Sequence, residues 1–325
     1  MYTSQKLQVA VLLPTYNGEK YVEQQIRSLR PNETDFTLHW LDDHSTDNTR
    51  EIVRSVAASA RISLREWHQP QRLGVPCSFF QLLECVEADI YLFCDQDDIW
   101  QPGKISATVD NLLPDLPRPV ICFSDPLLFR EDNPERGYRL LDIMKVRPEV
   151  AMQESRTFMA LVGYGNTQGF TKPLRDLYVN HKDVAREYAA MHDIWMYNVA
   201  VASGGARLLS QAPTTLYRWH ATNSSEGFGS WGRGRIPRLT TSWKQHQNLR
   251  RAVSRNAEGF ILASETLPES PKLTELLSVA RLVSSIRERQ SPAAMIRLTR
   301  HRAIWACKRL ALESAAVCLC SDAGH

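Results

Sequence analysis

Three carboxylates lie within four residues of one another where an apolar run ends. The run at residues 90–94 is followed by Asp95-Gln96-Asp97-Asp98. Such closely spaced negative charges repel one another, so a cation nearby would stabilise them. Mg²⁺ and Mn²⁺ prefer oxygen ligands, and Mg²⁺ often combines one or two carboxylates with substrate phosphates. The segment therefore indicates a divalent-cation site or, equally from these residues alone, an acidic turn before a helix.

A second acidic pair, Asp42 and Asp43, ends another apolar run. Successive residues at a strand end face opposite sides, so only one of the two can point into a given cleft. Its carboxylate could accept a hydrogen bond from a nucleobase N–H or a ribose hydroxyl, and an Asx turn explains the pair equally well. Tyr16, in the turn after the first apolar run, could stack on a base, although a lone Tyr in a turn usually only packs.

Asp193 opens an apolar stretch that contains Trp195, Met196 and Val199. A carboxylate at a cleft could take the proton of an attacking hydroxyl group, whose pKa is very high. From the residues alone, a helix N-cap explains this Asp more simply.

The elements that would position these residues alternate along the first 125 residues. Five β-rich runs occupy residues 7–13, 37–42, 62–67, 90–94 and 120–123, and helical stretches between them occupy residues 19–29, 48–60, 75–84 and 103–113. Ser45 and Asp47 are candidate N-caps of the second helix. The alternation predicts an α/β fold built from βαβ units on a mainly parallel sheet. Ligands bind at the carboxyl ends of such strands, which is where the polar segments stand.

Composition sets wide limits on the class of protein. The chain has 325 residues, of which 43% are hydrophobic and 23% charged, which excludes global disorder and predicts about two structural units. The 7 cysteines form no C-x-x-C pair, which favours buried thiols in a reducing compartment. We find no apolar run of membrane-spanning length and no signal-peptide core, so the sequence predicts a cytoplasmic protein.

Charge is distributed unevenly along the chain. Residues 231–325 contain 16 Lys and Arg against 7 Asp and Glu, a balance of +9, whereas the preceding residues contain 23 against 29, a balance of −6. Four glycines at residues 227–237 indicate a linker, which divides the chain into a first domain at 1–228 and a basic helical region at 229–325. We expect chemistry in the first and contact with an anionic surface or partner in the second.

The C-terminal region has two helical patterns. Leu273, Leu276, Leu277, Ala280 and Val283 form a stripe at helical spacing, and a seven-residue repeat follows at Leu298, Trp305, Leu312 and Leu319. Cations between apolar residues at 295–310 indicate a helix that could lie on an anionic membrane. Packing against the first domain, or pairing of two subunits into a homodimer, explains the helices equally well. The tail shows no interleaved aromatic platform and no recognised nucleic-acid-binding motif, so no nucleic-acid partner is expected.

The order of the motifs closely resembles the family 2 glycosyltransferases, and the D-Q-D-D-x-W signature is similar to a bacterial rhamnosyltransferase branch. The resemblance covers residues 7–225, and its segments are individually weak but jointly specific: Val11-Leu12-Leu13-Pro14-Thr15-Tyr16-Asn17-Gly18, Asp42-Asp43-His44-Ser45-Thr46-Asp47-Asn48-Thr49, Phe93-Cys94-Asp95-Gln96-Asp97-Asp98-Ile99-Trp100, Gly165-Asn166-Thr167-Gln168-Gly169-Phe170, His192-Asp193-Ile194-Trp195 and Tyr217-Arg218-Trp219-His220-Ala221-Thr222-Asn223.

The resemblance implies a GT-A fold, Rossmann-like with a mainly parallel sheet, and transfer of a sugar from a nucleotide diphosphate to an acceptor hydroxyl, usually with inversion. It implies a donor site at Pro14, Thr15, Tyr16, Asn17, Asp43, Arg72 and Asp95, with Tyr16 stacking on the base and Asp43 accepting a base N–H. It implies Asp193 as the general base, and Mg²⁺ or Mn²⁺ held by Asp97 with Asp95 and His220 beside it. The acceptor would be a glycan or a lipid-linked oligosaccharide in the synthesis of a cell-surface polysaccharide such as an O-antigen.

Two departures and two other functions bear on this interpretation. The chain has His44 where the family usually has Gly, and Ser78 where it commonly has Asn, and both positions lie near the expected nucleotide. A nucleotidyltransferase would carry a glycine-rich, basic phosphate loop near the N-terminus, which the chain lacks. An inactive sugar-nucleotide-binding or scaffolding protein predicts loss of the acidic residues, yet Asp95, Asp97 and Asp193 are all present.

Overall fold

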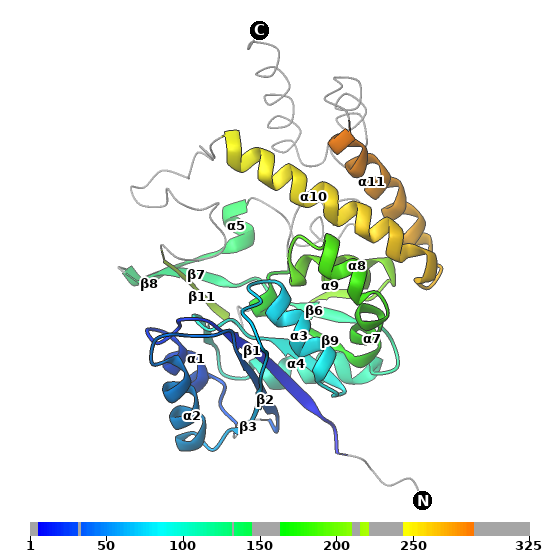
Figure 1. Ribbon diagram of the computed structural model, residues 1–325. Coiled ribbons are helices and arrows are strands. Elements are labelled where there is room, and N and C mark those ends of the chain that lie inside the picture. Colours follow the sequence, from blue (N-terminus) through cyan, green and yellow to red (C-terminus); the bar gives the residue numbers. More distant parts are fainter. Residues whose placement is uncertain are drawn as a thin grey trace, which may run out of the picture.

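A computed structural model describes residues 6–31, 34–131, 133–144, 163–209, 215–220 and 243–288 (Figure 1). A seven-stranded sheet forms its centre, in the order β10 (Ala206–Leu208), β6 (Ile121–Phe123), β9 (Gly169–Thr171), β4 (Ile90–Phe93), β1 (Val9–Thr15), β2 (Thr37–Asp42) and β3 (Ser63–Trp67). β1 runs parallel to β2 and β4, β2 to β3, and β10 to β6. β9 is antiparallel to both β4 and β6. The predicted α/β fold with a mainly parallel sheet is confirmed.

Alternate residues of β1 supply two separate hydrophobic cores, one on each face of the sheet. Ala10 and Leu12 belong to one core, while Val9, Val11 and Leu13 belong to the other. The first core is covered by α3 (Cys77–Cys85), α7 (Lys172–Asn180), α8 (Lys182–Tyr188) and α9 (His192–Ala202). The second is covered by α1 (Val22–Ser28), α2 (Thr49–Ser59) and α4 (Lys104–Leu112). Burial on both faces explains why β1, β4 and β6 are nearly continuous apolar runs in the sequence.

A smaller sheet stands beside the carboxyl end of β4. Its strands are ordered β5 (Ile99–Trp100), β11 (Thr215–Trp219), β7 (Leu127–Arg130) and β8 (Asn133–Arg139), and α5 (Leu140–Met144) follows β8. β11 is antiparallel to β5 and parallel to β7. β5 begins directly after the acidic segment. Its pairing with β11 therefore places β11, which lies more than 100 residues later in the chain, next to those carboxylates. This sheet was not predicted from the sequence.

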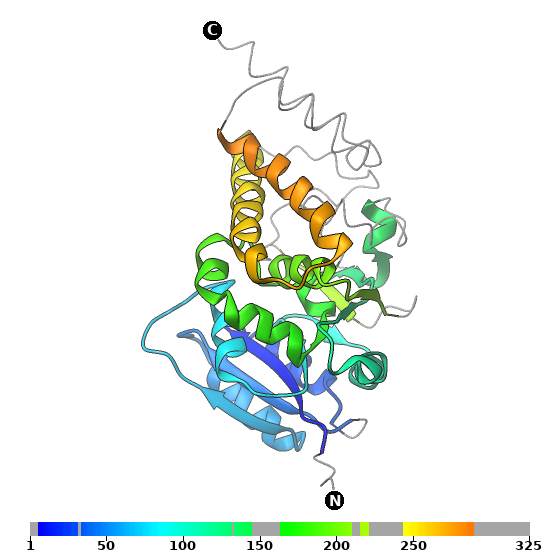
Figure 2. The ribbon, with the colours of Figure 1, turned by 90° about the vertical axis from the view of Figure 1, so that its right-hand side faces the viewer.

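The helices α10 (Trp243–Ala263) and α11 (Pro271–Glu288) pack beside each other on the same side of the large sheet as α8 and α9 (Figures 1 and 2). The predicted stripe on α11 is buried there: Leu273, Leu276, Ala280 and Val283 join the first core, and Leu277 packs against it. In this part of the chain the stripe therefore packs against the first domain. The seven-residue repeat and the basic residues at 295–310 lie outside the described residues.

The predicted helices and strands of the first 125 residues agree with the structure to within three residues at each end. The proposed N-cap positions of the second helix differ from the structure: α2 begins at Thr49, and Asn48 at its N-cap position makes no side-chain cap bond. Asp47, one residue earlier, does accept a hydrogen bond from Thr49 N at 3.1 Å. Ser45 instead accepts a hydrogen bond from Asn17 N at 2.9 Å, so its hydroxyl joins two loops. Among the described residues, no helix is both long and apolar enough to cross a bilayer.

Candidate active site

The loop after β1 is joined to the acidic segment by a pair of hydrogen bonds. Tyr16 N donates to Gln96 Oε1 at 2.9 Å, and Gln96 Nε2 donates to Tyr16 O at 3.1 Å. A Cβ atom on Gly18 would lie 2.4 Å from Gln96 Oε1, so glycine is needed there for this close approach. Sequence reasoning assigned no role to Gln96, although it stands inside the acidic motif. Its amide sets the spacing between the candidate base-stacking residue and the carboxylates.

Two residues of the expected donor site are engaged with the protein itself. Thr15 is buried, and its hydroxyl donates to Asp42 at 3.2 Å and accepts from Trp40 Nε1 at 2.9 Å. Asn17 Oδ1 accepts from Thr46 N at 2.8 Å. These contacts fix the backbone of the turn at residues 14–18, so Thr15 and Asn17 shape the loop and leave Tyr16 as its aromatic surface.

Asp42 and Asp43 point to opposite sides, as predicted for consecutive residues at a strand end. Asp43 is buried, and its two carboxylate oxygens accept hydrogen bonds from Gln69 Nε2 at 2.6 Å and from the backbone N–H groups of Leu73 and Gly74, both at 2.7 Å. Asp42 instead accepts from Ser45 N at 3.0 Å. Asp43 therefore holds the loop at residues 69–74 beside the turn at 14–18.

That loop places Arg72 over the exposed face of the candidate stacking residue. The Arg72 guanidinium lies 3.6 Å from the centre of the Tyr16 ring, and its Nε is 4.0 Å from Asp43 Oδ2. The structure thus brings Tyr16, Asp43 and Arg72 together, as expected of one binding site. A base that stacked on Tyr16 would have to displace the Arg72 side chain or share the ring with it.

The unusual residue His44 keeps the backbone conformation of a glycine. Its φ angle is +66°, in the left-handed region that most residues avoid. Its ring Nε2 lies 3.3 Å from the carbonyl oxygen of Gln69, and this contact joins it to the loop that Asp43 holds. A glycine at this position could therefore adopt the same backbone conformation.

The three carboxylates of the acidic segment have three different surroundings. Asp98 is buried and accepts from Asn166 Nδ2 and from Arg218 N, the latter at 2.9 Å. Asp97 is partly exposed and lies 2.9 Å from His220 Nε2. Burial, together with the charges of Asp98, Asp97 and Asp193, raises the pKa of Asp95 well above its usual range. Within the described part of the chain, Asp95 is the one of these three whose carboxylate has no hydrogen-bond or ion-pair partner.

Asp193 lies at the first turn of α9, close enough to the acidic segment for its charge to act on Asp95. Its Oδ2 accepts from Gly165 N at 3.0 Å, and its Oδ1 accepts from Ile194 N at 2.8 Å. Burial raises the pKa of Asp193 to about 6, against the opposing effect of those N–H donors. A carboxylate with that pKa, held at the end of a helix, is suited to accept a proton near neutral pH.

The residue before the candidate base has an apolar environment. His192 stacks on Phe79 with ring centres 3.8 Å apart and meets Phe93 edge-on at 4.7 Å. Burial lowers the pKa of His192 to about 3, so the ring is neutral. A Cβ atom on Gly165 would lie 2.8 Å from His192 Nε2, which explains why a glycine is needed where this loop crosses α9.

The donor set fits a divalent cation that is completed by phosphate oxygens. Asp95 and Asp97 offer carboxylates whose mutual repulsion a cation would relieve. No group of three or more His, Cys, Asp or Glu in the described ranges is arranged to hold a metal ion. His220 reaches Asp97 directly, so it orients that carboxylate. We therefore expect the protein to supply two carboxylates and a bound ligand to supply the remaining oxygens.

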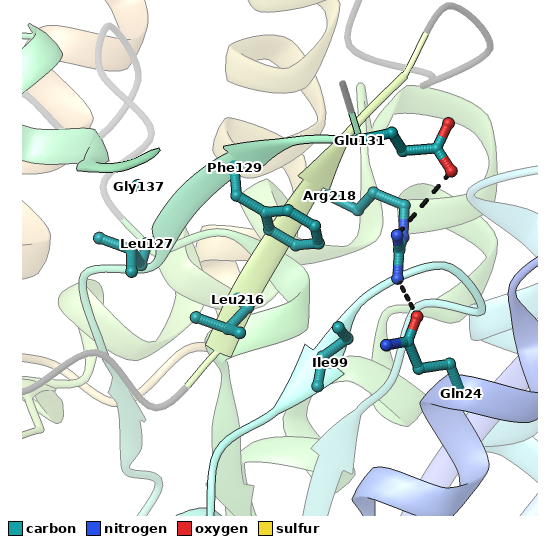
Figure 3. A pocket seen from close by; sticks show the side chains of 8 residues that line it. All are labelled: Gln24, Ile99, Leu127, Phe129, Glu131, Gly137, Leu216 and Arg218. Carbon is teal, nitrogen blue, oxygen red and sulfur yellow. Dashed lines mark hydrogen bonds and ion pairs between the residues drawn. The ribbon is translucent and has the colours of Figure 1, made fainter. Parts of the chain in front are cut away.

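A cavity of about 350 Å³ adjoins the acidic segment on the smaller sheet (Figure 3). Arg218 connects the two: its Nε donates to Asp97 O at 2.8 Å, and its other nitrogens meet Gln24 and, at 3.9 Å, Glu131. The residues that line the cavity are Gln24, Ile99, Leu127, Phe129, Glu131, Gly137, Leu216 and Arg218. None of them is among the candidate reacting groups, so the cavity lies beside the site.

Comparison with known proteins shows which proteins this chain is similar to. Residues 10–138 match the model of the family described as glycosyl transferase family 2. The dTDP-rhamnosyl transferase RfbG of Shigella flexneri is 27% identical over 220 residues, which are 65% of this chain and 72% of that protein. Protein RfbJ of the same organism is 26% identical over 105 residues, 32% of this chain and 76% of that protein.

Solved structures show the same fold at lower identity. The Staphylococcus aureus protein TarS (residues 1–349), in complex with UDP-GlcNAc, aligns over 84% of this chain and 72% of its own, with a TM-score of 0.54 and 18% identity. The mannosyltransferase PcManGT of Pyrobaculum calidifontis, in complex with GDP-Man and Mn²⁺, aligns over 97% and 87%, with a TM-score of 0.50 and 16% identity. The predicted GT-A fold is thereby confirmed.

The left-handed turn at His44 can be tested by unfolding in urea. His44→Val should lower the free energy of unfolding by about 1–2 kcal/mol, because a β-branched residue is strained at this φ. His44→Gly should match or exceed the wild-type stability, with only the contact to Gln69 lost. Equal loss in both variants would mean that the side chain, and not the backbone conformation, holds the turn.

Proposed function

From the family 2 glycosyltransferase domain at residues 10–138, we propose that this protein is a metal-dependent, inverting glycosyltransferase. It moves a sugar from a nucleotide-diphosphate donor to a hydroxyl group of a glycan or lipid-linked acceptor. The observation that carries the proposal is Asp193, a buried carboxylate held at a helix end within electrostatic reach of Asp95 in the acidic segment. That arrangement sets a proton acceptor opposite a group of carboxylates suited to a cation and a diphosphate.

The donor nucleotide would lie on the edge formed by the loops after β1, β2 and β4. Tyr16 offers its ring to the base, Arg72 lies over that ring, and Asp43 holds the loop that carries Arg72. Asp43 Oδ2 accepts one N–H, from Gly74, and a carboxylate oxygen has room for a second. Asp95 would lie near the ribose.

Asp97 and Asp95 would hold Mg²⁺ or Mn²⁺, which would supply positive charge at the leaving diphosphate. His220 keeps the Asp97 carboxylate oriented through its 2.9 Å contact. Asp193 accepts the proton of the acceptor hydroxyl as that oxygen attacks the anomeric carbon from the face opposite the diphosphate, which inverts the configuration. Burial keeps water from competing for the Asp193 carboxylate, and the N–H groups of Gly165 and Ile194 fix its direction.

Rhamnose is the donor sugar we favour, because the chain is similar to a dTDP-rhamnosyl transferase over 65% of its length. We assign catalysis to residues 1–228. The basic balance of the C-terminal residues supports a role for 229–325 at the anionic, cytoplasmic face of a membrane, where a lipid-linked acceptor for cell-surface polysaccharide would be found. Transfer from a panel of nucleotide sugars, followed by identification of the product, tests the choice of donor.

Removal of the metal should abolish transfer. We expect no turnover in excess chelator and recovery on addition of Mg²⁺ or Mn²⁺, because the leaving diphosphate requires a cation. Asp97→Asn should likewise remove activity while the thermal midpoint stays near that of the wild type, since Asp97 is partly exposed. Full transfer in chelator, or a large loss of stability in the variant, would contradict this assignment.

Asp193→Asn should reduce transfer by at least about 10²-fold, which is the lower end of the loss expected for a general base. Because the carboxylate must be deprotonated to accept a proton, wild-type turnover should rise with pH through about 6, the value to which burial raises the Asp193 pKa. The variant should lose this acidic limb. Donor affinity by calorimetry should change little, and its loss together with turnover would place Asp193 in the donor or metal site.

Tyr16→Ala and Asp43→Ala should mainly weaken donor binding. Loss of the stacking surface, or of the loop that carries Arg72, should cost about 1–3 kcal/mol of binding free energy. Glu66→Gln is the control, because Glu66 lies on the neighbouring strand β3 and pairs with Arg54 away from the loop. An unchanged Michaelis constant for the donor in both alanine variants would refute this nucleotide site.

A further inference from the structure

A buried polar cluster of Asp98, Lys104, Asn166 and Thr215 joins the three segments that carry the candidate reacting groups. All four side chains are buried. Lys104 Nζ donates to Asn166 O and, at 2.8 Å, to Thr215 Oγ1. Asn166 Nδ2 donates to Asp98 Oδ2, and Thr215 Oγ1 also donates to Asn166 O at 3.1 Å.

Each member of the cluster is adjacent in sequence or structure to a residue of the proposed mechanism. Asp98 follows Asp97 directly. Asn166 follows Gly165, whose N–H donates to the Asp193 carboxylate. Thr215 begins β11, whose far end leads to His220, and Arg218 N of that strand donates to Asp98 Oδ1 at 2.9 Å. The cluster thus connects the metal segment, the base and the residue that orients Asp97.

Stability alone does not account for a lysine in this position. The Lys104 side chain is buried, and its Nζ also lies 3.7 Å from the centre of the Trp100 ring. Burial lowers the pKa of Lys104 to about 7, so the protonated form is disfavoured there, and a well-packed apolar side chain in its place is often as stable or more so. What Lys104 provides is direction, because its Nζ donates to both the Asn166 carbonyl and the Thr215 hydroxyl.

We propose that Lys104, acting through Asn166, is a positioning residue that fixes the distance between the Asp193 base and the metal-binding segment. It contacts neither donor nor acceptor. Its Nζ fixes the backbone at Asn166, the neighbouring Gly165 N–H fixes the Asp193 carboxylate, and the Asn166 amide fixes Asp98 next to Asp97. A misplacement of about 1 Å between reacting groups can cost 10²-fold in rate, so such a brace has a kinetic effect that exceeds its effect on binding.

This inference rests on the proposed function, and a double-mutant cycle tests it. Lys104→Met and Asp193→Asn would be made singly and together, with transfer rate, donor affinity and the stoichiometry of donor binding measured for each. Lys104→Met should lower transfer by at least about 10-fold, with donor affinity within about threefold of wild type and one site still filled per chain. In the Asp193→Asn background the same change should cost less than about twofold, because no base is left to position.

Thr215→Val tests the same cluster while Lys104 is kept. It should lower transfer by at least about threefold in the wild-type background. In the Asp193→Asn background it should not lower transfer further. Thr171→Val is the matched control: Thr171 is equally buried, but its hydroxyl serves only the backbone at Arg118 and Val120, so transfer should stay at the wild-type rate.

Three results would overturn the inference. Equal losses from Lys104→Met in both backgrounds would show that it does not act through Asp193. A fall in transfer that only matches a fall in binding stoichiometry would show that Lys104 serves folding alone. Wild-type transfer in Asp193→Asn itself would remove both this inference and the proposed base, whereas the first two results leave the proposed function intact.

Discussion

Mutual repulsion among carboxylates at the end of β4 is the constraint on which the arrangement of the site depends. Asp95, Asp97, Asp98 and, from α9, Asp193 lie in one region, and burial, together with the charges of the other three, raises the pKa of Asp95. Water cannot screen these charges fully, because most of the region is buried. Each carboxylate therefore needs its own partner, and the partners come from segments distant in the sequence.

The smaller sheet and the reversed strand β9 supply those partners. β11 pairs with β5 and so presents Arg218 N to Asp98 and leads to His220 beside Asp97. β9 runs antiparallel between β4 and β6, so the loop before it returns to the carboxyl end of β4. That loop contains Gly165 and Asn166, which contact Asp193 and Asp98. Within the described residues, the Asp95 carboxylate is the one of these four that has no such partner.

The opposite edge of the site is built from loop-to-loop hydrogen bonds. Gln96 joins the acidic segment to the turn at 14–18, and Asp43 joins β2 to the loop at 69–74. The Arg72 guanidinium lies over the Tyr16 ring beside these bonds, 3.6 Å from its centre. Binding of a base would then exchange a cation–ring contact for a stacked ring, with little change required in the backbone that supports both.

The sequence by itself determined the βαβ order of the first 125 residues, because local periodicity records which residues must be buried on each strand and helix. It also placed Tyr16, Asp43, Asp95 and Asp97 at the carboxyl ends of strands, where the topology of a parallel sheet brings them together. It determined neither the smaller sheet nor the roles of Gln96, Lys104 and Asn166. Those roles come from contacts across 62 to 111 residues of chain, such as Lys104 with Asn166 and Thr215. Only the tertiary structure decides such contacts, because a polar residue within an apolar stretch has the same local pattern whether its partner is solvent or a distant backbone carbonyl.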